Sequence, residues 1–146
     1  MRLSVQSAAF DLGAEASGFM AGAAEAGAVV TFTGVVRDNG GTLSAMEIEH
    51  YPGMTERAIQ AMMVEAAARW ALVDVLVIHR YGRLLPGEGI MMVACAALHR
   101  GEAFAAAEFL MDYLKSRAPF WKKEIGAGGA EWVAAKDADE AALKRW

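Results

Sequence analysis

Hydrophobic and polar residues repeat along this chain with two different periods. Between residues 28 and 37 the side chains alternate between two faces, which predicts a strand that ends at Arg37. Between residues 55 and 70 the apolar residues recur with a period of about 3.6, which predicts an amphipathic helix. Residues 90–98 are apolar on both faces, as expected for a strand that is buried on both sides.

The same patterns assign the other elements. Strands are predicted at residues 3–6, 43–51, 73–81, 121–125 and 131–134, and helices from Asp11 towards Gly27, over residues 101–117 and from Asp137. The turn residues DNGG at 38–41 predict that strand 43–51 returns as the hairpin partner of strand 28–37. A turn at residues 85–89 predicts a second hairpin, between strands 73–81 and 90–98. Helices interleaved with hairpins indicate an α+β fold, and the length fits one domain, residues 1–146.

The composition is that of an ordinary soluble globular protein, with 55% hydrophobic and 22% charged residues. No segment reaches the roughly 20 uninterrupted apolar residues of a membrane span. The N-terminal MRLSVQ lacks the basic-then-apolar pattern of a secretory signal, so a cytoplasmic location is expected. The single cysteine, Cys95, lies in the apolar run 90–98, where a thiol is expected to be inert packing and not a nucleophile.

Basic residues gather in one stretch although the net charge of the chain is -4. Residues 111–124, MDYLKSRAPFWKKE, hold four of the 14 basic residues and have no carboxylate between Asp112 and Glu124. The four are Lys115, Arg117, Lys122 and Lys123. Complementing a helix C-terminus, worth about 0.3–1 kcal/mol, would explain only the two that precede Pro119. The cluster therefore predicts a local anionic ligand.

Pro119 divides this cluster between two elements. A proline biases the residue before it away from the helical region and ends the preceding helix. Lys115 is therefore expected on the last helical turns, and Lys122 on the extended segment that follows. The two amines are expected to converge from different elements.

A second basic pair, His99 and Arg100, lies where a buried strand meets a helix N-terminus. Backbone amides and the helix dipole favour a phosphate there, although His99 alone could equally be satisfied by neighbouring backbone groups. A helical rise of about 1.5 Å per residue puts this pair about 20 Å from Lys115. Either there are two sites, or a symmetric dimer brings the pair of one protomer against Lys115 and Lys122 of the other, which is the interpretation we favour.

Other motifs are weak. The glycines at 126–129 lack the Lys and Ser/Thr of a phosphate loop, and the three histidines lack metal-ligand spacing, so no metal and no cofactor are predicted. His79 and Arg80 are followed by Tyr81 and Gly82 where a helix start would be needed, which favours a structural role for the pair. The acidic net charge disfavours a nucleic-acid-binding module.

Several segments carry a resemblance to a known family over nearly the whole chain. They are VTFTGVVR at 30–37, EHYPGMTE at 49–56, VIHRYGRL at 77–84, HR at 99–100, MDYLKSRAPFWKKE at 111–124 and the closing KRW. With these segments the chain resembles the catalytic (large) subunits of molybdopterin synthase. The resemblance implies an α/β hammerhead core with an additional small antiparallel β subdomain.

The resemblance also implies an activity. It is that of a sulfurtransferase that converts cyclic pyranopterin monophosphate into molybdopterin, the dithiolene ligand of the molybdenum cofactor. Sulfur would come from the C-terminal Gly-Gly thiocarboxylate of a small ubiquitin-like partner subunit, whose tail inserts into the catalytic subunit. Two catalytic subunits, a homodimer, would form the centre of a heterotetramer. A lone buried Cys95 suits this mechanism, because the chain then needs no sulfur-bearing cysteine of its own.

Motif by motif, the resemblance implies that Lys115 and Lys122 are the catalytic residues. The implied substrate-binding residues are Val35, Val36, Arg37, His99, Arg100, Lys115, Lys122, Lys123 and Glu124. Val35 departs from the family pattern, which commonly has a lysine there, and the loop after Arg37 is short. The alternative function is a non-catalytic subunit that binds an anionic ligand or a partner's C-terminal tail. The presence of both lysines favours the enzyme.

Overall fold

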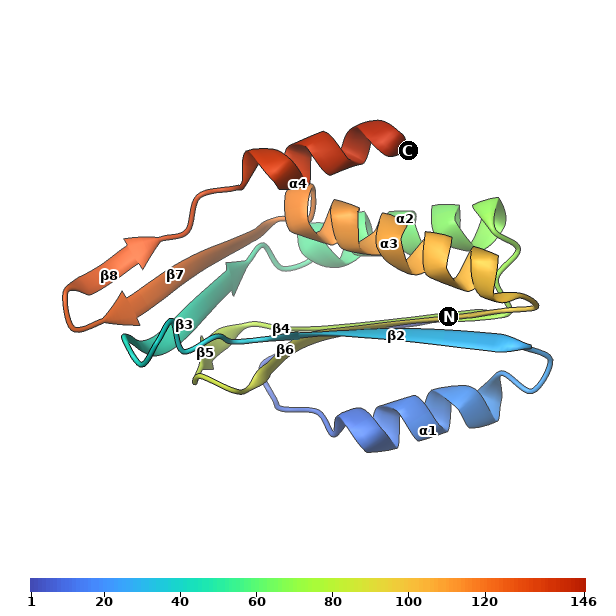
Figure 1. The fold of residues 1–146 in the computed structure, drawn as a ribbon, viewed down its shortest axis with the longest axis horizontal. Helices are drawn as coiled ribbons and strands as arrows, with labels where there is room; N and C mark the ends of the chain where they lie inside the picture. The colour runs from blue at the N-terminus through green and yellow to red at the C-terminus, as the bar shows by residue number, and fades with distance from the viewer.

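Two four-stranded sheets organise the computed structural model, which describes all 146 residues (Figure 1). The elements in chain order are β1 (Arg2–Gln6), α1 (Leu12–Gly22), β2 (Ala28–Val35), β3 (Leu43–His50), α2 (Met54–Arg69), β4 (Asp74–Arg80), β5 (Gly82–Leu84), β6 (Gly89–Ala97), α3 (Arg100–Ser116), β7 (Phe120–Gly126), β8 (Gly129–Trp132), α4 (Asp137–Ala142) and the 3-10 helix η1 (Leu143–Arg145). The strand order is β1-β4-β6-β2 in the first sheet and β5-β3-β7-β8 in the second. The predicted α+β fold is confirmed.

Helices cover both faces of the first sheet, with α1 on one face and α2 and α3 on the other (Figure 1). β1 pairs with β4 in parallel, whereas β4 with β6 and β6 with β2 are antiparallel. The apolar run at 90–98 forms β6, and it is buried from Ile90 to Ala97 because helices lie over both of its faces. The larger hydrophobic cluster includes Phe109 of α3, and the smaller one includes Phe19 of α1. None of the helices is long and apolar enough to cross a membrane.

The second sheet is antiparallel throughout, and it is the additional small β subdomain implied by the family resemblance. Figure 1 shows it beside one end of the first sheet. The side chains of β7 are mostly half-buried, and β8 is exposed along its whole length. The two strands predicted after Pro119 are present, and they pair with Lys123 opposite Trp132.

The prediction that strand 43–51 pairs with strand 28–37 is wrong. β3 pairs with β5 and β7 in the second sheet, whereas β2 pairs with β6 in the first. Residues 38–41 do turn the chain, since the N–H groups of Gly41 and Leu43 both donate to the Asp38 carbonyl. Turn residues fix the local backbone but not the strand that the chain meets next. Here the turn carries the chain from one sheet into the other.

Some boundaries also differ from the prediction. α1 ends at Gly22 and not near Gly27. β2 ends at Val35 and not at Arg37, because its register with β6 shifts between Gly34 and Val35. The predicted hairpin of β4 and β6 is confirmed, but the three-residue β5 lies between them in the chain. A strand that short shows no period in the sequence.

Candidate active site

Lys115 and Lys122 come together at the junction of α3 and β7. α3 ends at Ser116 and β7 begins at Phe120, so the helix and the strand lie on either side of Pro119 as predicted. Lys115 is exposed on the last turn of α3, whereas Lys122 is partly buried on β7. Burial, and then the charge of Lys115, lower the pKa of Lys122 below its ordinary value of 10.5. The two amines therefore lie close enough for the charge of Lys115 to affect the ionisation of Lys122.

The C-terminal segment, residues 136–146, lies along α3 and reaches the junction of α3 and β7. Arg145 of η1 forms an ion pair with Glu108 of α3 at 2.7 Å, which helps to hold the segment against the helix. The start of the segment lies near Lys122, since Asp139 raises the pKa of that lysine and Lys136 lowers it, both less strongly than burial does. The charge state of Lys122 thus depends on groups at the end of α3 and at the start of α4.

β7 presents its charged residues on two faces. Successive side chains of a strand point to opposite sides, so Lys122 and Glu124 share one face and Lys123 lies on the other. Nζ of Lys123 lies 4.4 Å from the centroid of the Trp132 ring on β8, a cation–π contact. Glu124 accepts a hydrogen bond from Asn39 Nδ2 at 3.4 Å, which ties β7 to the loop after β2.

The three predicted site residues at the end of β2, which are Val35, Val36 and Arg37, differ in how accessible their side chains are to a ligand. The Val35 side chain is 50% exposed, whereas that of Val36 is 2% exposed and packs in the core. The Val36 N–H donates to the Glu88 carbonyl at 3.0 Å, and its own carbonyl accepts from the Gly87 N–H at 2.8 Å. Val36 therefore anchors the end of β2 through its side chain and backbone. Arg37, the next residue, is exposed.

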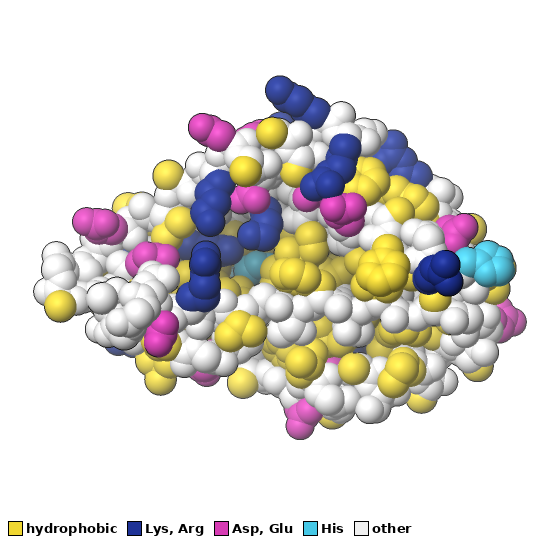
Figure 2. Space-filling view, in the orientation of Figure 1, with side chains coloured by type: hydrophobic (Ala, Val, Ile, Leu, Met, Phe, Trp, Pro, Cys, Tyr) yellow, Lys and Arg dark blue, Asp and Glu magenta, His cyan; other side chains and the backbone are white.

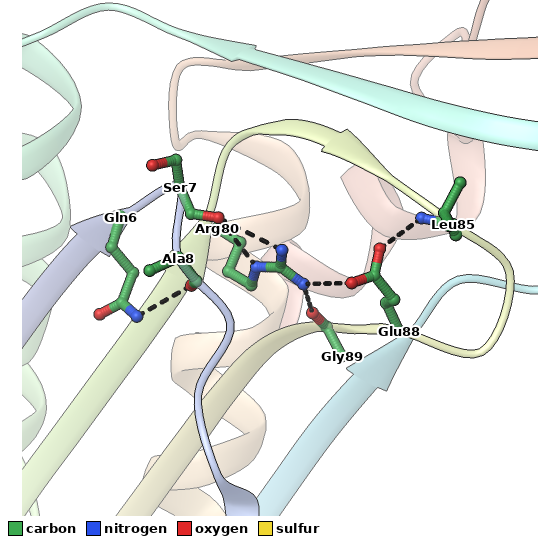
Figure 3. A network of polar contacts seen from close by, with 7 residues as sticks. All are labelled: Gln6, Ser7, Ala8, Arg80, Leu85, Glu88 and Gly89. Atoms are coloured by element: carbon green, nitrogen blue, oxygen red, sulfur yellow. Dashed lines mark hydrogen bonds and ion pairs between the residues drawn. The ribbon is translucent and has the colours of Figure 1, made fainter.

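A buried arginine supports this end of β2 (Figure 3). The Arg80 guanidinium donates through Nε and Nη2 to the Ser7 carbonyl at 3.3 and 3.2 Å, and through Nη1 to the Gly89 carbonyl at 3.1 Å. Nη1 also pairs with Glu88 Oε1 at 3.5 Å. Because the Glu88 backbone binds that of Val36, Arg80 helps to fix the end of β2. The structural role predicted for Arg80 is confirmed.

His99 and Arg100 lie at the opposite end of α3 from the lysines. His99 is the N-cap residue, without a side-chain capping bond, and both side chains are exposed. A rise of about 1.5 Å per residue separates Arg100 from Lys115 by about 22 Å along the helix. Figure 2 shows Lys and Arg side chains gathered where α3 ends, and an exposed histidine at the far end of the same face. One chain by itself does not bring the two groups together.

Arg117 of the predicted basic cluster pairs with Glu140 at 3.1 Å, but the other five predicted anion-binding cations have no acidic partner in the chain. None of the seven ion pairs includes them. They are Arg37, Arg100, Lys115, Lys122 and Lys123. These charges are therefore available to balance that of an anionic ligand.

Two histidines that the sequence patterns do not link to the site lie in its inner part. The His79 ring stacks on Phe120 with the centroids 3.7 Å apart, and burial lowers the pKa of His79 to about 3. The His50 ring stacks on Tyr81 with the centroids 4.3 Å apart. These contacts join distant parts of the chain, so no local pattern reveals them. The one available signal is the strand period, which puts Phe120 on the face of β7 that carries Lys122.

Cys95 lies inside the first sheet. It is 0% exposed on β6, and burial raises the pKa of its thiol to about 12. The prediction of a buried core cysteine is confirmed. No group of three or more His, Cys, Asp or Glu side chains is arranged to hold a metal ion.

The chain is similar to proteins of one family over its whole length. Residues 5–117 match the family model described as MoaE protein. A relative from Cereibacter sphaeroides, named molybdopterin synthase catalytic subunit, is 73% identical over 146 residues, which are 100% of each chain.

Solved structures give the same picture of the fold. The molybdopterin biosynthesis MoaE protein from Burkholderia ambifaria matches with a TM-score of 0.84 and 51% identity, over 99% of this chain and 96% of that one. A complex of subunits 1 and 2 of the molybdopterin-converting factor from Helicobacter pylori contains a chain that matches with a TM-score of 0.78 and 19% identity, over 92% of this chain and 90% of that one. The second likeness concerns the fold alone.

Proposed function

Since this chain belongs to the MoaE protein family, whose relatives are molybdopterin synthase catalytic subunits, we propose that it transfers sulfur to the molybdopterin precursor through Lys115 and Lys122. The precursor is cyclic pyranopterin monophosphate, and the product is the dithiolene molybdopterin. The observation that carries this proposal is that two lysine amines without acidic partners, one exposed and one partly buried, lie close together at the junction of α3 and β7.

The charges of the site suit both reactants, because the cyclic phosphate and a thiocarboxylate are both anionic. Opening the phosphate ring develops further negative charge, which a fixed cation such as Lys115 stabilises. The lowered pKa of Lys122 makes its neutral amine more accessible than that of an ordinary lysine. A neutral amine can act as a base or as a nucleophile, whereas exposed Lys115 is suited to holding an anion.

Two chains are proposed to share each site. Arg100 lies about 22 Å from Lys115 along α3, so a single small substrate reaches both only across a dimer. A surface suited to a second copy lies between them, because β2 is an edge strand next to α3 and exposes Phe32. Leu98, just before α3, and Phe104, within it, are 60% and 62% exposed. Figure 2 shows hydrophobic side chains exposed between the basic group and the histidine end.

The proposed sulfur donor is a small ubiquitin-like subunit with a C-terminal Gly-Gly thiocarboxylate. The similar Helicobacter pylori structure is a complex of two subunits of the molybdopterin-converting factor, which supports a partner of this kind. The tail would enter beside Lys115 and Lys122, where no acidic side chain pairs with either lysine. Two donors on a homodimer give the proposed heterotetramer, and the cytoplasm remains its expected location.

The test is single-turnover product formation with the purified chain, the thiocarboxylated partner and the precursor. The expected result is a dithiolene product with the natural chain and none with folded Lys115→Ala. A natural chain that binds both ligands but forms no product would instead favour the non-catalytic alternative.

A further inference from the structure

His79 is held in one orientation at the boundary between the two sheets. It lies on β4 of the first sheet, is 2% exposed, and stacks on Phe120 of the second sheet with an angle of 16° between the rings. Its Nδ1 lies 2.9 Å from the Arg80 carbonyl, which can only accept, so Nδ1 carries a proton and donates. The stacking and this hydrogen bond together fix the plane of the ring.

The fixed ring lies on the inner side of Lys122. Phe120 and Lys122 are two positions apart on β7, so their side chains point to the same face, and His79 packs against that face. The charge of Lys122 also acts on His79, where it adds to the effect of burial in lowering the pKa of the imidazole to about 3. At neutral pH the ring is therefore an uncharged, water-free surface next to the lysine.

Lys122 is surrounded by charged and titratable groups from several elements. They are Lys115 on α3, Asp139 and Lys136 at α4, His79 on β4, and His50 on β3, which acts on His79. Burial is the largest of the causes that lower the pKa of Lys122, and Lys115 comes second. The groups that produce this burial therefore matter more to the lysine than any single charge does.

We propose that His79 is a positioning residue that acts through Lys122. Its uncharged ring, packed on Phe120, shields the inner side of the lysine from water and so favours loss of the proton from the amine. The inference rests on the catalytic role proposed above for Lys122. Replacing the ring with a small side chain opens a cavity beside the lysine, and water that enters it solvates the ammonium form. An aromatic replacement still shields the lysine from water.

The experiment is a pH titration of the Lys122 amine by NMR of the 15N-labelled full chain, with the Nζ signal assigned through Lys122→Arg. His79→Ala is expected to raise the titration midpoint by about one pH unit. His79→Phe is expected to restore the natural midpoint to within a few tenths of a unit. The matched control is Ile78→Ala, the neighbouring buried residue of β4, which packs in the cluster under α1. It is expected to lower stability and leave the midpoint unchanged.

The pH profile of single-turnover sulfur transfer is then measured for the same variants, and its acidic limb is expected to move with the Lys122 midpoint. An unchanged midpoint in folded His79→Ala, or an equal shift in Ile78→Ala, overturns the inference. If His79→Ala does not fold, His79→Gln takes its place, because its polar amide also solvates the amine. A Lys122 midpoint that moves while the pH profile of sulfur transfer stays unchanged would confirm that His79 shields the lysine but would overturn the catalytic role of Lys122.

Discussion

The first sheet is covered on both faces and the second is not, and the two sheets differ in chemistry accordingly. In the first, β6 is buried along almost its whole length and its one thiol is kept protonated. In the second, β7 is half-buried and β8 is exposed, and β7 carries Lys122, Lys123 and Glu124. Half-burial lowers the pKa of Lys122 while leaving its amine accessible. Full burial would exclude the substrate, and full exposure would leave an ordinary lysine.

The comparison predicts that stability resides with the first sheet. Phe109, on the buried face of α3, is 0% exposed, so Phe109→Ala should lower the free energy of unfolding by about 3–5 kcal/mol. Trp132→Ala on exposed β8 should lower it by only about 0.5–1 kcal/mol, the value of its contact with Lys123. Urea unfolding of both variants measures the difference. Equal losses would mean that the second sheet is as much a part of the core as the first.

The second prediction assigns the chemistry to the junction with the second sheet. Lys115→Ala and Lys122→Ala should each lower the single-turnover rate by about 100-fold or more, because each removes a charge or a base from the transition state. Neither should change the free energy of unfolding by more than about 0.5 kcal/mol, since none of the seven ion pairs includes either lysine. Lys144→Ala, an exposed lysine of η1, is the control. Normal turnover in folded Lys115→Ala would remove that residue from the mechanism.

The third prediction concerns the two ends of α3. Chains with Arg100→Ala and chains with Lys122→Ala should each be nearly inactive, and mixing them should restore activity by tens of fold over either alone. One site of each mixed dimer then receives both intact halves. The assay is sulfur transfer after co-assembly, with mixed dimers identified by mass spectrometry. Mixed dimers without activity would place each complete site within one chain.

The fourth prediction is that the boundary between the sheets is sensitive to acid. His79 has a pKa of about 3 when folded against an ordinary 6.5, so below pH 6.5 the unfolded chain binds a proton that the folded chain does not. Stability from this group is therefore fully present at neutral pH and falls as the pH falls towards 3. The loss should be about 2 kcal/mol between pH 7.5 and 5. Urea unfolding at both pH values measures it, and His79→Phe should lose about 2 kcal/mol less over this interval.

The smallest effect is expected inside the first sheet. Cys95→Ala should transfer sulfur at the natural rate, because the thiol is fully buried and its pKa is raised to about 12. Its free energy of unfolding should fall by only about 1 kcal/mol, and that of Cys95→Ser by more, because a buried hydroxyl needs a partner. Single-turnover kinetics with thiocarboxylated partner supplies the measurement. Abolished transfer at unchanged stability would show that sulfur passes through this thiol.

The sequence predicts those parts of the molecule that depend on local or periodic patterns. The run at 90–98 predicts β6, and Pro119 predicts where α3 ends and a strand begins, so the placement of Lys115 and Lys122 follows from the sequence. The partner of β3 does not, because turn residues determine a bend and not the strand beyond it. The stacking of His79 on Phe120 is likewise a contact between distant segments. The sequence thus predicts the charged residues of the site better than the buried neighbours that affect their pKa.

The Arg80 network has a consequence for the order of folding. Arg80 and Gly89 are 9 residues apart, so this contact closes a small loop and can form early. Arg80 and Ser7 are 73 residues apart, and the parallel pairing of β1 with β4 spans a similar distance. Contacts of such long sequence separation slow folding, because a large loop must close before they form. We therefore expect β1, although it is the first strand to be synthesised, to dock late, and the end of β2 that precedes Arg37 to become rigid only then.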